Sequence, residues 1–166
     1  MKKLILMALA TTISLISCEK DSKNLPNNAV GYILSSSDNI ELSKKSMTAM
    51  EIGDSATYRS TYSEDAVFYD NLDTTTLDQN MQMFTNFKAK GITMKLEKLY
   101  DINEMVYDKP GYFGASNYVS AYGLYSLTRG DKKIYTVIHS IDGIKDGKQV
   151  VEWLRYDTKD IIEILK

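Results

Sequence analysis

The chain of 166 residues has a single cysteine and a single histidine, and these two counts limit the chemistry available to it. The single thiol, at Cys18, excludes an internal disulfide and any site built from several thiolates. The single imidazole, at His139, argues against a histidine-rich zinc site. The sequence shows no pattern typical of a Ser-His-Asp catalytic triad, of a phosphate-binding glycine loop or of a dinucleotide-binding motif. We therefore expect no metal ion and no cofactor.

Two aspartates and the histidine are the candidates for acid–base chemistry. Asp70 follows the first predicted strand, Asp157 ends the last one, and His139 lies within a strand. Each also has a structural interpretation, because aspartate favours turns and a lone strand histidine is more often structural. A simple hairpin places Trp153, Arg155 and Asp157 on one face of the last strand and His139 on the other. The sequence therefore assigns no catalytic set, and Asp157, Asp70 and His139 remain candidates.

Aromatic side chains are the candidates for the wall of a pocket. Tyr58 and Tyr62 lie four residues apart, so they share a face of a short predicted helix. We expect them to line a ligand pocket together with the face of the last strand that carries Trp153, Arg155 and Asp157. The predicted pocket therefore comprises Tyr58, Tyr62, Trp153, Arg155 and Asp157. The eight methionines suit an adaptable apolar pocket, and they suit an ordinary core equally well.

The N-terminus predicts export and lipid attachment. Lys2 and Lys3 precede a short apolar stretch, which is typical of a secretory signal peptide and too short for a membrane-spanning helix. This stretch ends in Leu15-Ile16-Ser17-Cys18, which resembles a bacterial lipobox. The resemblance implies that the Cys18 thiol is alkylated with diacylglycerol and that the chain is cut before it. An ordinary cleaved signal is the alternative.

Composition and charge then set the domain organisation. We expect a signal peptide over residues 1–17, the lipidated cysteine and a flexible polar tether over 18–37, and one domain over 38–166. The whole chain has a net charge of −2, and removal of Lys2 and Lys3 makes it −4. Nucleic acids and anionic membrane surfaces are therefore not expected partners. The expected location is the bacterial cell envelope, facing the periplasm or the exterior.

Helix signals dominate the first half of the domain. Asp38 to Glu41 reads as a capping box, with Asp38 as the cap of a helix that Gly53 ends. Asp54 is expected to cap a short second helix. A second capping box, Thr76 to Gln79, opens a third helix that ends at Gly91.

Strand signals dominate the second half. After a short strand at 66–70, we expect strands over 93–107, 113–127, 132–144 and 148–157. Asp146-Gly147 predicts a tight hairpin between the last two strands. Asp142-Gly143 is a rival turn or a bulge, and it leaves the register of this hairpin open.

The order of these elements resembles the nuclear transport factor 2-like superfamily, and in particular its SnoaL-like branch. The resemblance is carried by Gly53-Asp54 between two helices, by Tyr62 to Phe68, and by the final Asp146 to Trp153. It spans residues 38–160. It implies an α+β cone in which three N-terminal helices pack against a strongly curved, mainly antiparallel sheet that encloses a pocket. It also implies pairing of such domains through the sheet as homodimers.

The superfamily contains isomerases, dehydratases, epoxide hydrolases and cyclases beside non-catalytic binding modules, so the fold does not decide the function. In its epoxide hydrolases a catalytic aspartate lies two residues after a tryptophan of the last strand, where this chain has Arg155. The expected function is a membrane-anchored, non-catalytic module that binds a small apolar molecule or an envelope protein. The alternative is a small proton-transfer enzyme, an isomerase, dehydratase or cyclase-like protein, that uses the same pocket. A structural dimerising domain with a filled cone is the third reading.

Overall fold

The computed structural model describes residues 30–166, in which seven strands form one sheet in the order β1-β4-β5-β6-β7-β2-β3. Neighbouring strands are antiparallel except for β2 and β7, which run parallel. The strands are β1 Gly31–Leu34, β2 Tyr62–Asp70, β3 Asp73–Thr76, β4 Ile92–Tyr107, β5 Asn117–Arg129, β6 Lys132–Lys145 and β7 Lys148–Arg155.

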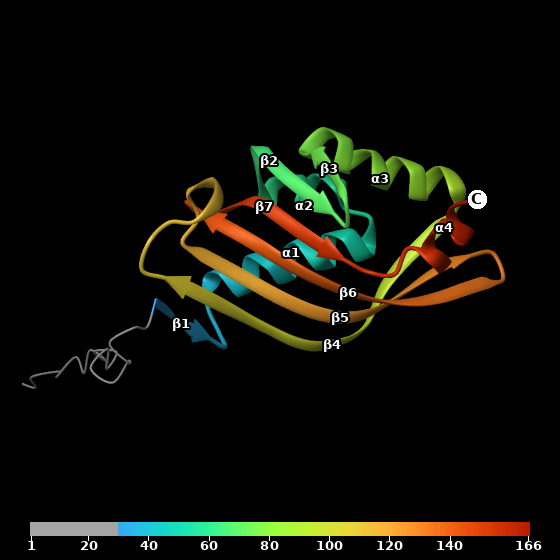
Figure 1. Cartoon of the computed structure of the whole chain (residues 1–166). Helices are drawn as coiled ribbons and strands as arrows, with labels where there is room; N and C mark the ends of the chain where they lie inside the picture. The colour runs from blue at the N-terminus through green and yellow to red at the C-terminus, as the bar shows by residue number, and fades with distance from the viewer. Residues whose placement is uncertain (1–29) are drawn as a thin grey trace, which may run out of the picture.

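The helices cover one face of this curved sheet (Figure 1). They are α1 Asp38–Ile52, α2 Ser55–Thr61 and α3 Leu77–Lys90, with a short C-terminal α4 Lys159–Leu165 and a 3₁₀ turn at Tyr112–Gly114. The expected α+β class, with three N-terminal helices against a curved and mainly antiparallel sheet, is confirmed. Residues 30–166 contain no helix that is both long and apolar enough to cross a membrane.

Most predicted helix ends are confirmed. Gly53 and Gly91 end α1 and α3 in the left-handed conformation, with φ of 73° and 62°. The side chain of Asp54 caps α2 by accepting a backbone N–H. Thr76 and Gln79 make both hydrogen bonds of the capping box that opens α3.

The first helix begins with a different cap from the predicted one. Ser37 is the N-cap, and its hydroxyl accepts the backbone N–H of Ile40 at 3.1 Å. Asp38 is the first helical residue instead, and Glu41 pairs with Lys44 at 2.8 Å rather than reaching back. The N-cap residue of a helix has a non-helical backbone, and Ser37 is extended whereas Asp38 is already helical. Asp38 and Glu41 still stabilise the helix, because acidic side chains in the first turn interact favourably with its positive end.

Several elements differ from the predicted ones because tertiary pairing creates them. The region predicted as a tether contains β1, which pairs with the end of β4. Strand β3 and helix α4 were not predicted, and α4 is held by Ile164, which packs in the core with Met47 and Leu127. The strand predicted from Phe113 begins at Asn117, because Phe113 adopts a φ of 58° in the 3₁₀ turn. The signal peptide, Cys18 and the tether up to residue 29 lie outside the described residues.

A bulge decides the register of the last hairpin. Asp146 and Gly147 form the predicted tight turn, with φ of 52° and 71°. Ile144 pairs with Gln149, but Gly143 pairs with Val151, so the ladder shifts by one residue between them. Glycine is needed at position 143, because an added Cβ would lie 2.5 Å from a methyl carbon of Val151.

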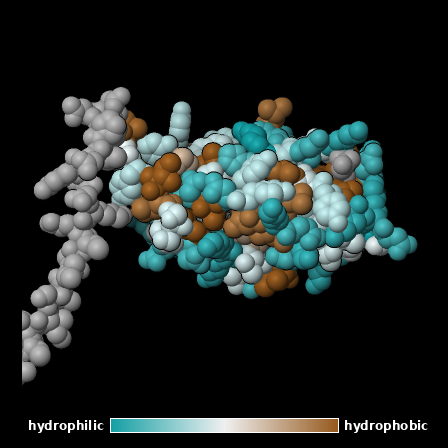
Figure 2. All heavy atoms as spheres, turned by 90° about the horizontal axis from the view of Figure 1, so that it is seen from below, coloured by the Kyte–Doolittle hydropathy of each residue, from teal (hydrophilic) through white to brown (hydrophobic). Residues whose placement is uncertain are grey.

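The main core lies between the helices and the concave face of the sheet. One buried cluster joins α1, β4, β5 and α4, and a second joins α2, β2 and the start of α3. Buried apolar area of this kind is the dominant stabilising contribution to the fold. Figure 2 shows one outer face of the molecule, on which hydrophobic residues form small scattered groups among hydrophilic ones.

Candidate functional site

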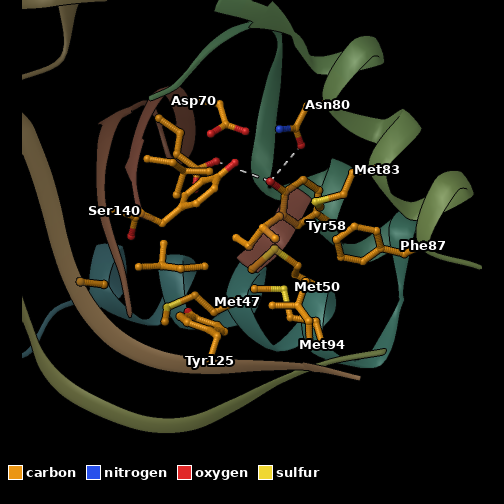
Figure 3. Close-up of a pocket in the computed structure, with 17 residues that line it drawn as sticks. Met47, Met50, Tyr58, Asp70, Asn80, Met83, Phe87, Met94, Tyr125 and Ser140 are labelled. Carbon is orange, nitrogen blue, oxygen red and sulfur yellow. Dashed lines mark hydrogen bonds between the residues drawn. The ribbon is translucent and has the colours of Figure 1, made fainter. Parts of the chain in front are cut away.

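A cavity of about 90 Å³ lies between the helices and the concave face of the sheet. Cavities of this order hold a few water molecules or one small organic molecule. Figure 3 shows a polar end with Asp70, Asn80 and the Tyr58 hydroxyl, and an opposite end with methionine and aromatic side chains. The lining residues are Met47, Met50, Tyr58, Asp70, Asn80, Met83, Phe87, Met94, Ala121, Tyr125, Leu127, Ile138, Ser140, Glu152, Leu154, Tyr156 and Ile161.

Glu152 is the buried carboxyl group of this cavity. It lies on β7, is 8% exposed, and faces the cavity with Leu154. The Tyr62 hydroxyl donates a hydrogen bond to its Oε2 at 2.9 Å. The Tyr58 hydroxyl lies 3.5 Å from the same oxygen and donates to Asn80 Oδ1 at 3.1 Å.

Asp142 lies directly opposite Glu152 in the β6–β7 ladder and is buried behind it. Its Oδ2 accepts a hydrogen bond from the Ser43 hydroxyl of α1 at 2.6 Å, while its Oδ1 is buried and has no partner within the described part of the chain. Burial raises the pKa of Asp142 to about 7. Burial, and then the neighbouring Asp142 charge, raise the pKa of Glu152 to about 8. The pair therefore holds protons at pH values where ordinary carboxyl groups have lost them.

A third carboxyl group, Asp70, lines the polar end from the end of β2. Partial burial raises its pKa, opposed by a hydrogen bond with Tyr156, and the nearby Asp73 charge raises it further. Its Oδ1 is buried and unpaired within residues 30–166. Two carboxyl groups thus line the polar end of the cavity, and a third, Asp142, lies behind Glu152. No three His, Cys, Asp or Glu side chains in this part of the chain are arranged to hold a metal ion.

The structure brings together part of the predicted site. Tyr58 and Asp70 lie in the cavity wall, and the Tyr62 hydroxyl reaches Glu152 from behind that wall. Tyr58 and Tyr62 do contact each other, with ring centroids 4.9 Å apart, although Tyr62 is already the first residue of β2. Whether Tyr58, Tyr62 or Asp70 acts on a ligand stays a prediction.

The rest of the predicted pocket lies elsewhere, and the expected face of β7 was the wrong one. Trp153 and Arg155 project to the outer face, where Trp153 stacks against Tyr69 with centroids 5.8 Å apart. Strand alternation is the reason: if Glu152 and Leu154 point into the cavity, their neighbours point away. Asp157 is exposed beyond the end of the strand, and its Oδ1 accepts a hydrogen bond from the backbone N–H of Lys159 at 2.9 Å. This is the turn role expected from the sequence as the alternative to a pocket role.

His139 also lies on the outer face, away from the cavity. The bulge pairs it with Arg155, whereas the simple hairpin predicted them on opposite faces. Its Nε2 is 2.9 Å from the Ser120 hydroxyl, and its ring meets the edge of Tyr122. No contact joins His139 to Asp70 or Asp157, so the three candidates do not form one acid–base set.

Sequence reasoning missed Glu152 and Asp142, the two carboxyl groups that the structure pairs. Their signal was present, because Glu152 stands in the middle of the apolar run Val150 to Leu154. The sequence predicts a rival turn or a bulge at Asp142-Gly143, which does not identify Asp142 as a buried carboxyl group. A charged residue in the middle of a predicted central strand indicates a buried polar site, and this signal would have found both.

The raised pKa values predict that this protein loses stability as the pH rises from 5 to 8. Below pH ~4 both states hold these protons, whereas above it the unfolded chain loses protons that the folded chain keeps. The free energy of unfolding therefore falls until the pH passes the folded pKa values of about 7 and 8. We expect the free energy of unfolding of Glu152→Gln to fall less between pH 5 and 8, by on the order of 2 kcal/mol. Urea unfolding at pH 5, 6.5 and 8 measures this difference. The exposed control Glu41→Gln leaves the fall unchanged, and an unchanged fall in Glu152→Gln would contradict the assignment.

The comparisons with known proteins concern the fold. No protein-family model matches the sequence, and no curated protein matches it. The LEH-like epoxide hydrolase of M. tuberculosis is similar in structure, with a TM-score of 0.58 and 15% identity over 77% of this chain and 89% of that one.

Two further solved structures are similar. A putative polyketide cyclase from Xanthomonas campestris pv. campestris has a TM-score of 0.60 and 10% identity, covering 78% of this chain and 97% of that one. An NTF2-like protein of unknown function from Cytophaga hutchinsonii has a TM-score of 0.51 and 9% identity, covering 76% and 95%. At such identities the likeness concerns the fold and not the chemistry. Residues 30–166 therefore have the nuclear transport factor 2-like (NTF2-like) fold.

Proposed function

We propose that this chain is an envelope lipoprotein whose NTF2-like domain binds a small, largely apolar molecule in the cavity that Glu152 lines. The observation that carries the proposal is a cavity of about 90 Å³ with a buried carboxyl group in a mostly apolar wall. An apolar cavity with a few convergent polar groups is the usual form of a small-molecule site. Titratable groups with shifted pKa values in such a cavity add support.

The wall of the cavity suits an adaptable binding site. Met47, Met50 and Met94 come from α1 and β4 and gather at the apolar end, while Met83 of α3 lines the cavity beside Tyr58 (Figure 3). Methionine side chains are unbranched and polarisable, so they adjust to ligands of different shape. Bulky side chains do not close the cone, which argues against the filled structural domain.

The envelope location rests on the N-terminal sequence alone. The stretch Leu15-Ile16-Ser17-Cys18 and the two preceding lysines support lipid attachment at Cys18, and the bilayer is then a partner through that lipid. Membership of the SnoaL-like branch, a protein partner in the envelope and homodimer formation through the sheet belong to the same proposal.

A proton-transfer enzyme is the second candidate, and Glu152 favours it. Its pKa near 8 and its position in the cavity wall allow it to give or take a proton close to neutral pH. The neighbouring Tyr58 and Asn80 offer polar groups for a substrate oxygen. Among the similar structures, an epoxide hydrolase and a putative polyketide cyclase are enzymes by their names, whereas the Cytophaga protein has no stated function.

Filling the cavity tests ligand binding. Ala121 is 3% exposed and lines the cavity, so we expect Ala121→Phe to occupy the ligand space. After incubation with an extract of the bacterial envelope, mass spectrometry of the washed full-length protein should find a small molecule that Ala121→Phe lacks. Val137→Phe, on the outer face of β6, is the matched control and keeps the molecule. Equal retention, or no retention, by all three proteins overturns the proposal.

Removing the thiol tests the lipid anchor. In bacteria fed a labelled fatty acid, we expect the natural chain to carry the label and Cys18→Ala to carry none, because only the thiol accepts the diacylglycerol. Ser17→Ala keeps a small residue before the cysteine and should remain labelled. Labelling of Cys18→Ala would exclude this anchor.

Exchange of an acidic C–H bond tests the second candidate. Cyclohexanone is a probe for this chemistry, because acid–base catalysis exchanges the hydrogens beside its carbonyl for deuterium in D₂O. If Glu152 acts as a base, the protein speeds this exchange, and Glu152→Gln slows it about 100-fold or more. NMR spectroscopy measures the rate, with Glu41→Gln as the unaffected control. A rate equal to that of buffer alone leaves binding as the function.

A further inference from the structure

We propose that the ligand is a small organic cation, an amine with an apolar body, whose ammonium group meets Glu152 and Asp70 at the polar end of the cavity. This inference rests on the proposed function, because it names the chemical class that the same cavity accepts. It depends on the charges, the hydrogen-bond acceptors and the aromatic rings that the structure places around this space.

The charges around the cavity are of one sign. Glu152 and Asp70 line it, and Asp142 lies directly behind Glu152. None of the lining residues is lysine, arginine or histidine. Arg155 lowers the pKa of Asp70 only weakly, and its guanidinium is on the outer face, where it donates to the backbone carbonyls of Leu154 and Tyr69. An anionic ligand would meet uncompensated carboxyl groups, whereas a cation would complement them.

Hydrogen-bond acceptors at this end lack donors. The two tyrosine hydroxyls that reach Glu152 both approach its Oε2, and Oδ1 of Asp70 is buried without a partner among residues 30–166. The Tyr58 and Tyr62 hydroxyl hydrogens are already directed to Asn80 Oδ1 and Glu152 Oε2. An ammonium group brings three donors and no acceptor, so it can satisfy both carboxyl groups at once. An alcohol brings one donor and satisfies only one of them.

Aromatic rings and thioethers form the remainder of the wall. Tyr58, Phe87, Tyr125 and Tyr156 line the cavity beside the four methionines, and Figure 3 shows Tyr125 and Phe87 towards its apolar end. Ring faces attract cations and also pack against an apolar body, and the attraction grows where water is excluded. This combination suits an amine with a compact hydrocarbon or aromatic body.

Binding of a cation must be linked to proton release. Glu152 faces Tyr58, Tyr62, Tyr125 and the carboxyl groups of Asp142 and Asp70, and no basic side chain of residues 30–166 is among the groups that shift its pKa. Burial therefore favours its protonated form. Asp70 faces Asp73, Tyr156 and, more remotely, Arg155. An ammonium group favours the ionised carboxyl groups, so it displaces a proton and binds more tightly as the pH rises.

Three probes of nearly equal size test the inference: benzylamine, benzyl alcohol and benzoate. Calorimetric titration of the full-length protein at pH 8 should show benzylamine binding at least about tenfold more tightly than benzyl alcohol, with benzoate weakest. Lowering the pH to 5.5 should weaken the binding of benzylamine but not that of benzyl alcohol. The reason is that the ammonium group of benzylamine keeps its charge at this pH, while Glu152 gains a proton. Titration in two buffers with different ionisation heats should show proton release with benzylamine only.

Two variants locate the preference. Glu152→Gln should remove most of the advantage of benzylamine over benzyl alcohol, with Glu41→Gln as the matched control. Asp70→Asn is a second variant at a less buried position, with the exposed Asp157→Asn as its control. A preference that persists in both cavity variants overturns the inference.

Failure of this inference differs from failure of the proposed function. If benzyl alcohol or benzoate binds as tightly as benzylamine and Ala121→Phe abolishes that binding, the cavity binds small molecules but not cations by preference. If none of the three probes binds, the cationic class is excluded, and the envelope-extract experiment alone then decides the proposed function.

Discussion

The pairing of Asp142 with Glu152 across the last hairpin is the constraint on which the site depends. A tight turn at Asp146-Gly147 joins the last two strands. A one-residue bulge between Ile144 and Gly143 then shifts the pairing, so that the two carboxyl groups lie opposite each other on the concave face. Two like charges in a dry interior raise the cost of ionisation, so the pair holds protons near neutral pH. The surrounding Ser43 and Tyr62 hydroxyls supply the hydrogen bonds that such burial requires.

The rest of the architecture turns this pair into the wall of a cavity. Helices α1, α2 and α3 close the concave face, but the side chains of Met50, Met83 and Phe87 leave a space that the sheet residue Ala121 is too small to fill. A core without function would be expected to fill such a space and to avoid unpaired carboxyl oxygens. The cost of keeping both features is a reason to attribute a binding role to this cavity.

Similar folds host different chemistry, and the residues of this chain decide its own. The similar structures range from an epoxide hydrolase to a protein of unknown function, at identities of 15% and 9%. Here Asp70 and Glu152 line the polar end of the cavity, Asp142 lies behind Glu152, and no lining residue is basic. That local charge pattern, rather than the fold, points to the chemical class of the ligand.

The sequence by itself determined the local features: the helix ends at Gly53 and Gly91, the capping box at Thr76 and the tight turn at Asp146-Gly147. These depend on backbone conformation within a few residues, which residue type controls directly. Only the tertiary structure decided which face of β7 is buried. Alternation sorts Glu152 from Trp153 but does not say which side the helices cover, and the bulge that moves His139 to the outer face arises from pairing with another strand. The candidate site was therefore only partly predictable, because it depends on contacts between segments distant in the chain.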